Sequence, residues 1–413
     1  MSSQIRETVI IILLAATAGL IVIGFYITRQ KVENGEKGLP VFDLFFPAAK
    51  DKELLEDKSI KQKTETDEGE KKLEERDEEK LSALNLRQLT TEAVAGFSLI
   101  GDKIRFVEKA TGHVFEIDQT SAKPVRISNT TVPKIQEAYF SKSGGAAVFR
   151  YAKDKTNAIE NVIVKIGTTT EVTGRLPISL TSVTPNPQKD AFFYLEEGEG
   201  GSIGTTLDLA KKQKPLQKKT VFNSPAIEWV VSWPTPEKIL LATKPSAAAT
   251  GFAYLLNSKS GELERVLGDR IGLTASLSPD GQRILFGETS GNSLNLGVFD
   301  RKSGEDFSLA AQSLPEKCVW SAKNKDFVYC AVPRTVTTLS YPDAWYRGEI
   351  SFSDDLWKFN LDTGEDEIII TSDDDLDATR LMLSPNEKYL YFQNKRDDTL
   401  WILTFPEGNP RGK

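Results

Sequence analysis

The ten residues Leu277–Phe286, with the sequence LSPDGQRILF, decide the fold of this chain. Leu277 ends one short apolar segment, Ser278–Gly281 form a polar stretch, and Ile284–Phe286 begin a second, strongly apolar segment. Serine, proline, aspartate and glycine favour tight turns because of their backbone preferences and local side-chain hydrogen bonds. Two apolar runs joined by such a turn are typical of a β-hairpin.

The same pattern recurs six more times along the chain. The other copies begin at Phe97, Phe140, Val183, Trp233, Trp320 and Leu383. In chain order the seven starts are separated by 43, 43, 50, 44, 43 and 63 residues. A period of about 40–45 residues is typical of a four-stranded propeller blade. The repeat therefore predicts an all-β fold, a seven-bladed β-propeller over residues 84–407, followed by a tail at 408–413.

The repeat also resembles a known family. After the turn and the second apolar run, a third run ends in Asp or Asn, and a short turn with glycine follows, as in Asp362–Gly364 and Lys302–Gly304. Together with Ser278–Gly281 and Ser384–Asn386, this pattern resembles the WD40-like repeats of TolB-type propellers over about residues 85–406. The resemblance implies a fold and is nearly silent on function, because propellers host many unrelated roles.

The resemblance further implies how the ring closes. Each blade of the family runs from an innermost first strand to an outermost fourth strand. The last repeat has segments for three strands, 379–384, 389–393 and 400–405, before the chain ends. The missing fourth strand is expected from residues 86–90, which precede the first blade. Such a clasp protects an otherwise open sheet edge.

Residues 8–28 contain no charged side chain, and this run of 21 residues is long enough to span a bilayer as a helix. The alternative is a cleaved signal peptide with a small-x-small site at 16–18, but cleavage there would leave an apolar new terminus. We predict a single-pass membrane anchor. Arg29, Lys31 and Lys37 favour a cytoplasmic C-terminal side, although long domains translocate largely regardless of such charges.

Residues 29–83 read as a flexible charged stalk. The apolar patch 41–46 is either an interfacial segment on the membrane or a short hydrophobic stretch in a disordered linker. Residues 51–80 contain 13 acidic and 8 basic side chains. Such a segment cannot bury enough apolar surface to offset the entropy of ordering it, so we expect a solvated, disordered linker.

The overall composition excludes several kinds of site. The formal net charge of -7 argues against nucleic acid as a partner. Two cysteines and one histidine are too few for a zinc site with about four Cys/His ligands. His113 lies in a glycine-containing loop without a nucleophile motif beside it, so it reads as an exposed loop residue. We predict no catalytic residue and no cofactor.

The two cysteines flank the hairpin turn of the sixth repeat. Cys318 and Cys330 are equidistant from its centre near Asn324, which places them opposite one another on adjacent antiparallel strands. We predict a disulfide, the alternative being two small buried residues that never bond. Because disulfides persist outside the cytosol, the pair favours an extracytoplasmic propeller at the cell membrane.

The sixth repeat carries a long insertion between its second and third strands, residues 333–355. Long loops on a rigid scaffold often carry function. We expect a binding surface for a peptide, glycan or protein partner, formed by Tyr341, Asp343, Trp345, Tyr346 and Arg347. Nearby, Asp373, Asp374 and Asp375 are candidates for a Ca²⁺ site. The alternative is that the aromatic side chains pack over the ring and the aspartates are solvated.

Three functions fit these features. We favour a protein that is not an enzyme, a membrane-tethered module for protein or glycan interaction, or a scaffold, at the cell envelope. The alternative is a propeller-based extracytoplasmic hydrolase or lyase acting on glycans or peptides, although no Ser-x-Asp-x-Gly-x-Thr-Trp box of sialidase type is present. The third is a sensor whose partner is another chain.

Overall fold

The computed structural model describes residues 85–405 apart from 120, 122, 154, 155, 157, 210–215, 292, 337–339 and 373. The expected membrane anchor at 8–28, the stalk at 29–83 and the tail at 408–413 fall outside these residues. No helix in the described part of the chain is both long and apolar enough to span a bilayer.

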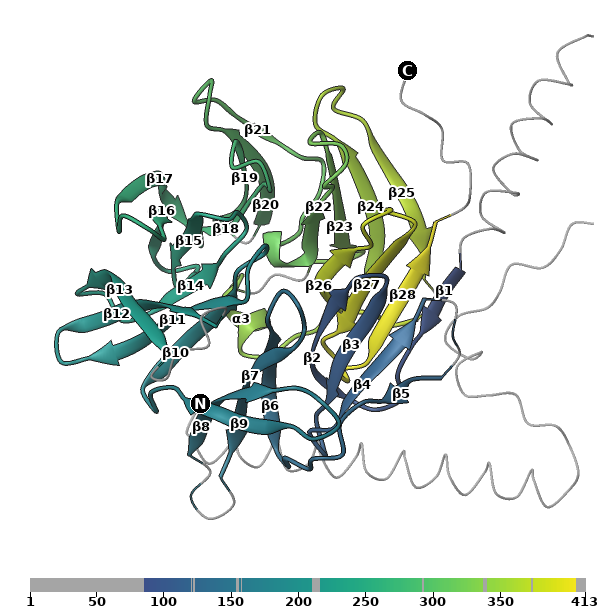
Figure 1. Ribbon diagram of the computed structural model, residues 1–413. Helices are drawn as coiled ribbons and strands as arrows, with labels where there is room; N and C mark the ends of the chain where they lie inside the picture. The colour runs from purple at the N-terminus through teal and green to yellow at the C-terminus, as the bar shows by residue number, and fades with distance from the viewer. Residues whose placement is uncertain are drawn as a thin grey trace, which may run out of the picture. The chain divides into compact units, whose positions relative to one another are not determined.

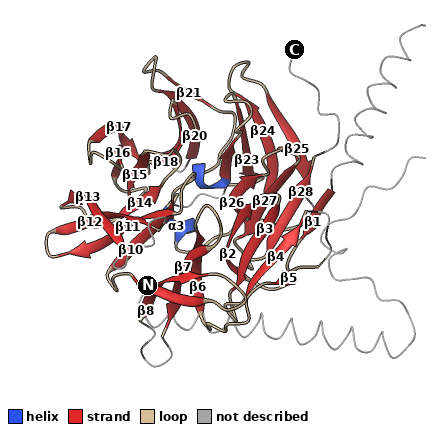
Figure 2. Ribbon diagram, in the orientation of Figure 1, coloured by secondary structure: helices blue, strands red, loops and turns tan. Residues whose placement is uncertain are grey.

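Seven four-stranded antiparallel sheets surround a common centre, which confirms the seven-bladed propeller (Figure 1; Figure 2). Blade one contains β2 (Val94–Ile100), β3 (Lys103–Glu108), β4 (Val114–Asp118) and β5 (Val125–Arg126). Blade two contains β6 (Ile135–Phe140), β7 (Ala146–Ala152), β8 (Ile159–Lys165) and β9 (Glu171–Arg175). Blade three contains β10 (Leu180–Pro185), β11 (Ala191–Gly198), β12 (Gly201–Asp208) and β13 (Gln217–Ser224).

The next three blades follow in chain order. Blade four contains β14 (Trp229–Ser232), β15 (Lys238–Thr243), β16 (Thr250–Asn257) and β17 (Leu263–Ile271). Blade five contains β18 (Thr274–Leu277), β19 (Arg283–Ser290), β20 (Ser293–Asp300) and β21 (Asp306–Ser308). Blade six contains β22 (Cys318–Trp320), β23 (Phe327–Pro333), β24 (Asp354–Asn360) and β25 (Asp366–Thr371).

Blade seven joins the two ends of the propeller. It contains β26 (Ala378–Leu383), β27 (Tyr389–Asn394), β28 (Leu400–Thr404) and β1 (Asn85–Gln88). β1 pairs antiparallel with β28, so that Leu86 faces Leu403 across the ladder. The clasp expected from the family resemblance is therefore confirmed.

The repeated turn is held by its own side chains. Ser278 Oγ donates to Asp280 Oδ1 at 2.6 Å and accepts from the backbone N–H of Arg283 at 2.9 Å. Gly281 adopts a positive φ of 73°, which glycine tolerates without a steric penalty. The equivalent serine of blade seven, Ser384, repeats the arrangement with Asn386 at 2.6 Å. The sequence motif thus builds its turn locally.

The hydrophobic core lies between neighbouring blades. Ala95 of blade one packs with Ala138 and Phe149 of blade two, and Leu255 of blade four packs with Ile284 of blade five. Because each blade covers the apolar face of the next, burial of these side chains holds the ring together.

The insertion of blade six lies near the centre of the ring, where α3 (Asp343–Tyr346) is drawn in Figure 1. It reaches blade four, where Asp343 Oδ2 accepts from the backbone N–H of Ala247 at 2.6 Å. It also contacts blade five, through Thr289 Oγ1 to Tyr341 O at 2.7 Å. Propeller blades surround a central channel, and the insertion contacts blades four and five near the centre of this ring.

Candidate functional site

The aromatic side chains of the insertion form a small core. Tyr341, Trp345 and Phe352 have exposed fractions of 0%, 3% and 3% and pack with Leu294 and Leu314. The rings of Tyr341 and Phe352 stack with centroids 5.7 Å apart. Tyr341 and Trp345 are therefore not displayed at the surface, and the alternative that these rings pack over the propeller is correct.

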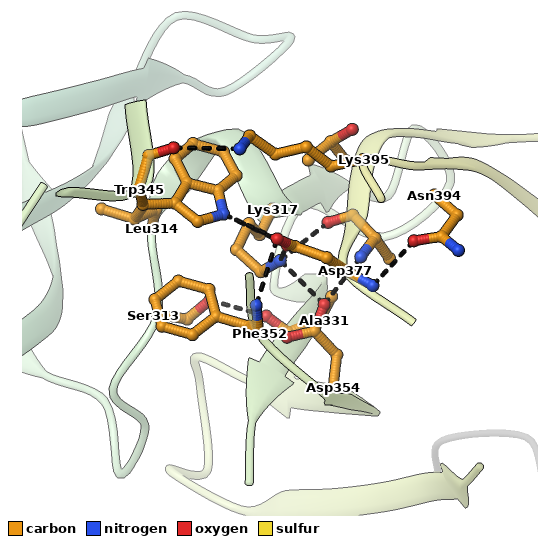
Figure 3. Close-up of polar contacts among 12 residues, drawn as sticks. Ser313, Leu314, Lys317, Ala331, Trp345, Phe352, Asp354, Asp377, Asn394 and Lys395 are labelled. Atoms are coloured by element: carbon orange, nitrogen blue, oxygen red, sulfur yellow. Dashed lines mark hydrogen bonds and ion pairs between the residues drawn. The ribbon is translucent and has the colours of Figure 1, made fainter. Parts of the chain in front are cut away.

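A buried polar cluster fastens this core to the propeller (Figure 3). Asp377, from the connection between blades six and seven, is at its centre. One of its carboxylate oxygens, Oδ2, accepts from Trp345 Nε1 at 2.9 Å and from the backbone N–H of Phe352 at 3.1 Å. We call Lys317, Trp345, Phe352, Asp354 and Asp377 the Asp377 network.

The ammonium group of Lys317 supplies the positive charge of the Asp377 network. This lysine ends the short 3₁₀ helix η2 (Pro315–Lys317), and its Nζ lies 2.7 Å from Asp354 Oδ2 and 2.5 Å from Asp377 Oδ1. It also sits over the Trp345 ring, 5.5 Å from the centroid. A charge removed from water persists only with such partners.

Two carboxylates, those of Asp354 and Asp377, share this one ammonium group. Burial raises the pKa of Asp354 to about 6; the charge of Lys317 opposes the rise, while that of Asp377 adds to it. Burial also lowers the pKa of Lys395, whose Nζ donates to Trp345 O at 2.9 Å. The network holds the insertion in place and leaves no open space for a substrate among its own side chains, which are buried.

The other expected binding residues of the insertion differ in exposure. Tyr346 is 38% exposed, and its hydroxyl donates to the carboxylate of Glu316. Arg347 is exposed and pairs with Glu349 at 2.6 Å, while Asp343 is held by blade four. A partner that docks on the insertion would therefore meet Tyr346 and Arg347, and this binding role stays a prediction.

The acidic loop before blade seven was the candidate metal site. Asp373 lies outside the described residues, whereas Asp374 and Asp375 are exposed and Asp375 accepts from Ser353 Oγ at 2.9 Å. Within the described part of the chain, no group of three or more His, Cys, Asp or Glu side chains could hold a metal ion. His113 contacts Thr131 Oγ1 at 3.0 Å through Nε2.

The two cysteines lie opposite one another on adjacent strands, as their spacing around the hairpin turn predicts. Cys318 and Cys330 are direct partners in the β22–β23 register. A disulfide joins their sulfur atoms.

A second polar cluster lies on the first strand of blade seven and the first two strands of blade two. Four consecutive innermost strands contain a register shift near their first residues, at Thr379/Met382, Val94/Gly96, Ile135/Glu137 and Leu180/Ser182. In the described chain, the innermost strands β14, β18 and β22 have none. β-Bulges change the direction of side chains and are frequent beside active sites. The side of the ring formed by blades seven, one, two and three is therefore a candidate site.

Arg380 shows the effect of the bulge in β26. It is exposed and has a φ of 53°, and its guanidinium donates to Ala95 O of blade one at 3.3 Å. Gly96 lets blades one and two approach closely here, because a Cβ at this position would lie 2.1 Å from Ala138 O. A left-handed non-glycine residue costs about 1–3 kcal/mol, and such residues cluster at ligand-binding sites.

Blade two contributes the remaining groups. Arg150 Nη1 lies 2.5 Å from Glu137 Oε2, and Arg150 Nη2 donates to Leu180 O of blade three at 3.3 Å. Burial of the phenol, followed by the charge of Glu137, raises the pKa of Tyr139 to about 12, while Arg380 and Arg150 oppose the rise.

These contacts define the channel-mouth cluster: Glu137, Tyr139, Arg150 and Arg380. At neutral pH its phenol is a proton donor, because the raised pKa keeps Tyr139 protonated. The cluster thus combines one carboxylate, one phenol and two guanidinium groups.

Sequence reasoning did not single out these four residues. A signal was present, because Glu137 and Arg380 place charges in the innermost strands of blades, where the neighbouring residues Ala138 and Leu381 are buried. The positions of the bulges that contain these residues could not be read from the repeat.

Comparison with known proteins gives matches among solved structures alone, since no protein family and no curated protein matches this sequence. An oligogalacturonate lyase in complex with manganese has a TM-score of 0.52 and 11% identity, covering 79% of this chain and 91% of its own. The oligogalacturonate lyase of Vibrio parahaemolyticus has a TM-score of 0.52 and 10% identity, with coverages of 79% and 98%. TolB of Acinetobacter baumannii has a TM-score of 0.41 and 13% identity, with coverages of 79% and 64%.

These matches correct one expectation. We expected a protein that is not an enzyme, yet two solved structures with the same fold are named as lyases, so that expectation is withdrawn. At about 10% identity the likeness extends to the fold alone. This chain is a seven-bladed β-propeller, similar in fold to oligogalacturonate lyase.

Proposed function

We propose that this protein is a propeller-based lyase that acts on a carboxylate-bearing glycan at the channel-mouth cluster. The observation that carries the proposal is that Arg380, at a bulge and with a positive φ, lies near enough to the phenol of Tyr139 for its charge to act on that group, as the charge of Glu137 also does. Guanidinium groups bind carboxylates through paired, charge-assisted hydrogen bonds. The names of the two similar structures add support, since oligogalacturonate is a carboxylate-bearing glycan.

The proposed reaction is a β-elimination. Arg380 holds the sugar carboxylate and stabilises the negative charge that develops next to it. Glu137 accepts the proton from the carbon beside that carboxylate, and the released electron pair forms a carbon–carbon double bond. The bond from the neighbouring carbon to the glycosidic oxygen breaks, and that oxygen takes a proton from Tyr139. The balance requires no water and no redox partner, and a carboxylate and a phenol are suitable acid–base groups.

Hydrolysis fits the cluster less well. Glycoside hydrolases generally use two carboxyl groups about 5–10 Å apart, and the channel-mouth cluster contains one. Manganese belongs to one of the similar structures, whereas the described part of this chain contains no cluster of metal ligands. The proposed steps therefore use the side chains of this chain alone.

The position of the blade-six insertion supports a substrate site at the channel-mouth cluster. The insertion contacts blade four through Asp343, blade five through Tyr341 and blade seven through Trp345. A half-covered channel suits a chain-like substrate, which would enter beside blades one to three. Rigid walls with a loop above them are a usual setting for catalysis.

A cellular setting is also proposed. We propose that residues 8–28 tether the propeller to the cell membrane and that the propeller is extracytoplasmic. The uncharged run of residues and the Cys318–Cys330 disulfide support this setting. Thiol-specific labelling of intact cells, with and without prior reduction, would test it; two free thiols before reduction would contradict it.

The activity is tested by incubating the full chain with oligogalacturonate and with a neutral oligogalactoside. We expect ultraviolet absorbance from the new double bond with the acidic substrate alone, and product masses that add up to the substrate mass without added water. The variants Arg380→Gln and Tyr139→Phe should lower kcat/KM by about 100-fold or more, because each removes a charge-stabilising or proton-donating group.

The matched control is Arg126→Gln, which changes an exposed arginine on the outermost strand of blade one. It should leave the turnover unchanged. Products that contain added water would identify a hydrolase instead. If folded protein produces no double bond from oligogalacturonate or from other uronate-containing glycans, the lyase proposal fails.

A further inference from the structure

A polar cleft lies between blades three and four, away from the blade-six insertion. It is formed by the turns between the first and second strands of both blades and by the third-to-fourth-strand turn of blade four, which are on the opposite face of the propeller from the insertion. Its volume is about 210 Å³. Pockets for drug-sized ligands are larger, about 300–1,000 Å³, so this cleft suits a single sugar ring or a smaller group.

The charges that line the cleft favour an anion. Lys189, Lys219 and Lys259 line it together with one acidic residue, Asp208. Lys259 pairs with Glu237, and the ammonium group of Lys219 donates to Lys259 O.

Lys189 differs from the other two lysines. Its backbone N–H donates to Asn186 Oδ1 at 2.9 Å, but within the described part of the chain its ammonium group has no hydrogen-bond or ion-pair partner. It is exposed at the edge of the cleft. Its three N–H donors are therefore available to a ligand.

Trp233 adds a second observation that points to a ligand. Its side chain lines the cleft and is 7% exposed, and its indole Nε1 is buried without a hydrogen-bond partner in the described part of the chain. Buried N–H groups are nearly always paired in proteins. A ligand oxygen in the cleft would give this donor the partner that the described residues do not supply.

We infer that this cleft binds the oxyanion of a small polar ligand, and specifically the carboxylate of one sugar ring, with Lys189 as the charged partner and Trp233 Nε1 as a donor. The choice of an acidic sugar rests on the proposed function, whereas the charge and the donors of the cleft do not. A second site for acidic glycan on the far face would keep a long substrate attached between turnovers at the channel mouth.

The test is calorimetric titration of the full chain, in which Arg380→Gln is present throughout to disable the channel mouth. The probes are galacturonate, galactose and inorganic phosphate. We expect galacturonate to bind and galactose not to bind. Lys189→Gln should weaken galacturonate binding about tenfold, as expected for loss of a charge-assisted hydrogen bond. Trp233→Phe, which keeps a ring and removes the N–H, should weaken it by several-fold.

The matched control is Lys218→Gln. Lys218 neighbours Lys219 in β13, but its ammonium group lies over the Tyr194 ring, 5.9 Å from the centroid, and it does not line the cleft. This variant should bind as before. Equal weakening by Lys218→Gln, equal affinity for galactose, or binding of phosphate without galacturonate would each overturn the inference. Binding that depends on Lys189, together with no lyase turnover by the parent protein that retains Arg380, would sustain this inference and reject the proposed function.

Discussion

Lys317 Nζ lies 2.7 Å from Asp354 Oδ2, and neither side chain is accessible to solvent, with exposed fractions of 0% and 1%. The two residues come from different sides of blade six: Lys317 precedes its first strand, and Asp354 begins its third. Their pairing, together with Asp377, places ionic groups under an aromatic layer. Such a cluster is sensitive to the loss of any member, because a buried charge without its partner is strongly unfavourable.

Lys317→Met should destabilise the propeller by about 3–5 kcal/mol, since it leaves the carboxylates of Asp354 and Asp377 buried without a counter-charge. Urea unfolding followed by fluorescence measures the change. The matched control is Lys302→Met at an exposed turn, which should change the free energy of unfolding by no more than about 0.5 kcal/mol. If the two variants lower the free energy of unfolding equally, the buried ion pairs of Lys317 do not contribute to the stability of the propeller.

The stability of the propeller should fall as the pH rises from about 4 to about 6. In the folded state burial raises the pKa of Asp354 from its ordinary 3.8 to about 6, so within this window the folded state binds a proton that the unfolded state has lost. The stabilisation from this proton is present at low pH and lost above pH 6, and it is at most on the order of 3 kcal/mol.

The Asp354→Asn variant isolates this group. Comparing urea midpoints at pH 5 and pH 7.5 should show a smaller decline for the variant than for the parent protein. A parent protein that loses no more stability than Asp354→Asn over that interval would contradict the assignment to Asp354.

Trp345→Phe should loosen the insertion without unfolding the ring. It removes the indole N–H that donates to Asp377 Oδ2, and loss of a partner of a buried carboxylate costs about 1–3 kcal/mol. Hydrogen exchange should become faster at the amides of residues 340–353 and stay unchanged in blades one to three. Arg347→Ala, at an exposed position of the same insertion, is the control and should leave exchange as it was.

Replacing both Leu86 and Arg87 with proline should open blade seven. The N–H groups of adjacent strand residues point to opposite edges, so the pair of prolines removes at least one ladder hydrogen bond between β1 and β28. We expect a lower Tm and greater cleavage of the chain near residues 85–90 by proteases. The control Arg87→Ala keeps the backbone N–H; if it lowers Tm as much, the side chain rather than the strand pairing is responsible.

The prediction of the fold rested on local signals. The Ser278–Gly281 turn is held by contacts among residues at most five apart, so its effect can be read from a short stretch of chain. The opposite placement of Cys318 and Cys330 follows from hairpin geometry alone. The expected display of Tyr341 and Trp345 failed because exposure depends on what lies across the channel, and local sequence does not record that.

By itself, the sequence determined the seven blades and the pairing of the cysteines, because each depends on turns and alternation within a few residues or on a regular period. The closing strand was expected from the family resemblance, since it pairs residues from the two ends of the propeller. The tertiary structure alone decided where the polar groups meet. Arg380 and Glu137 come from blades seven and two, far apart in the sequence, and their charges both act on Tyr139 only after the ring closes; each residue lies at a bulge of one residue. The Asp377 network likewise exists only once the insertion has folded back over the channel.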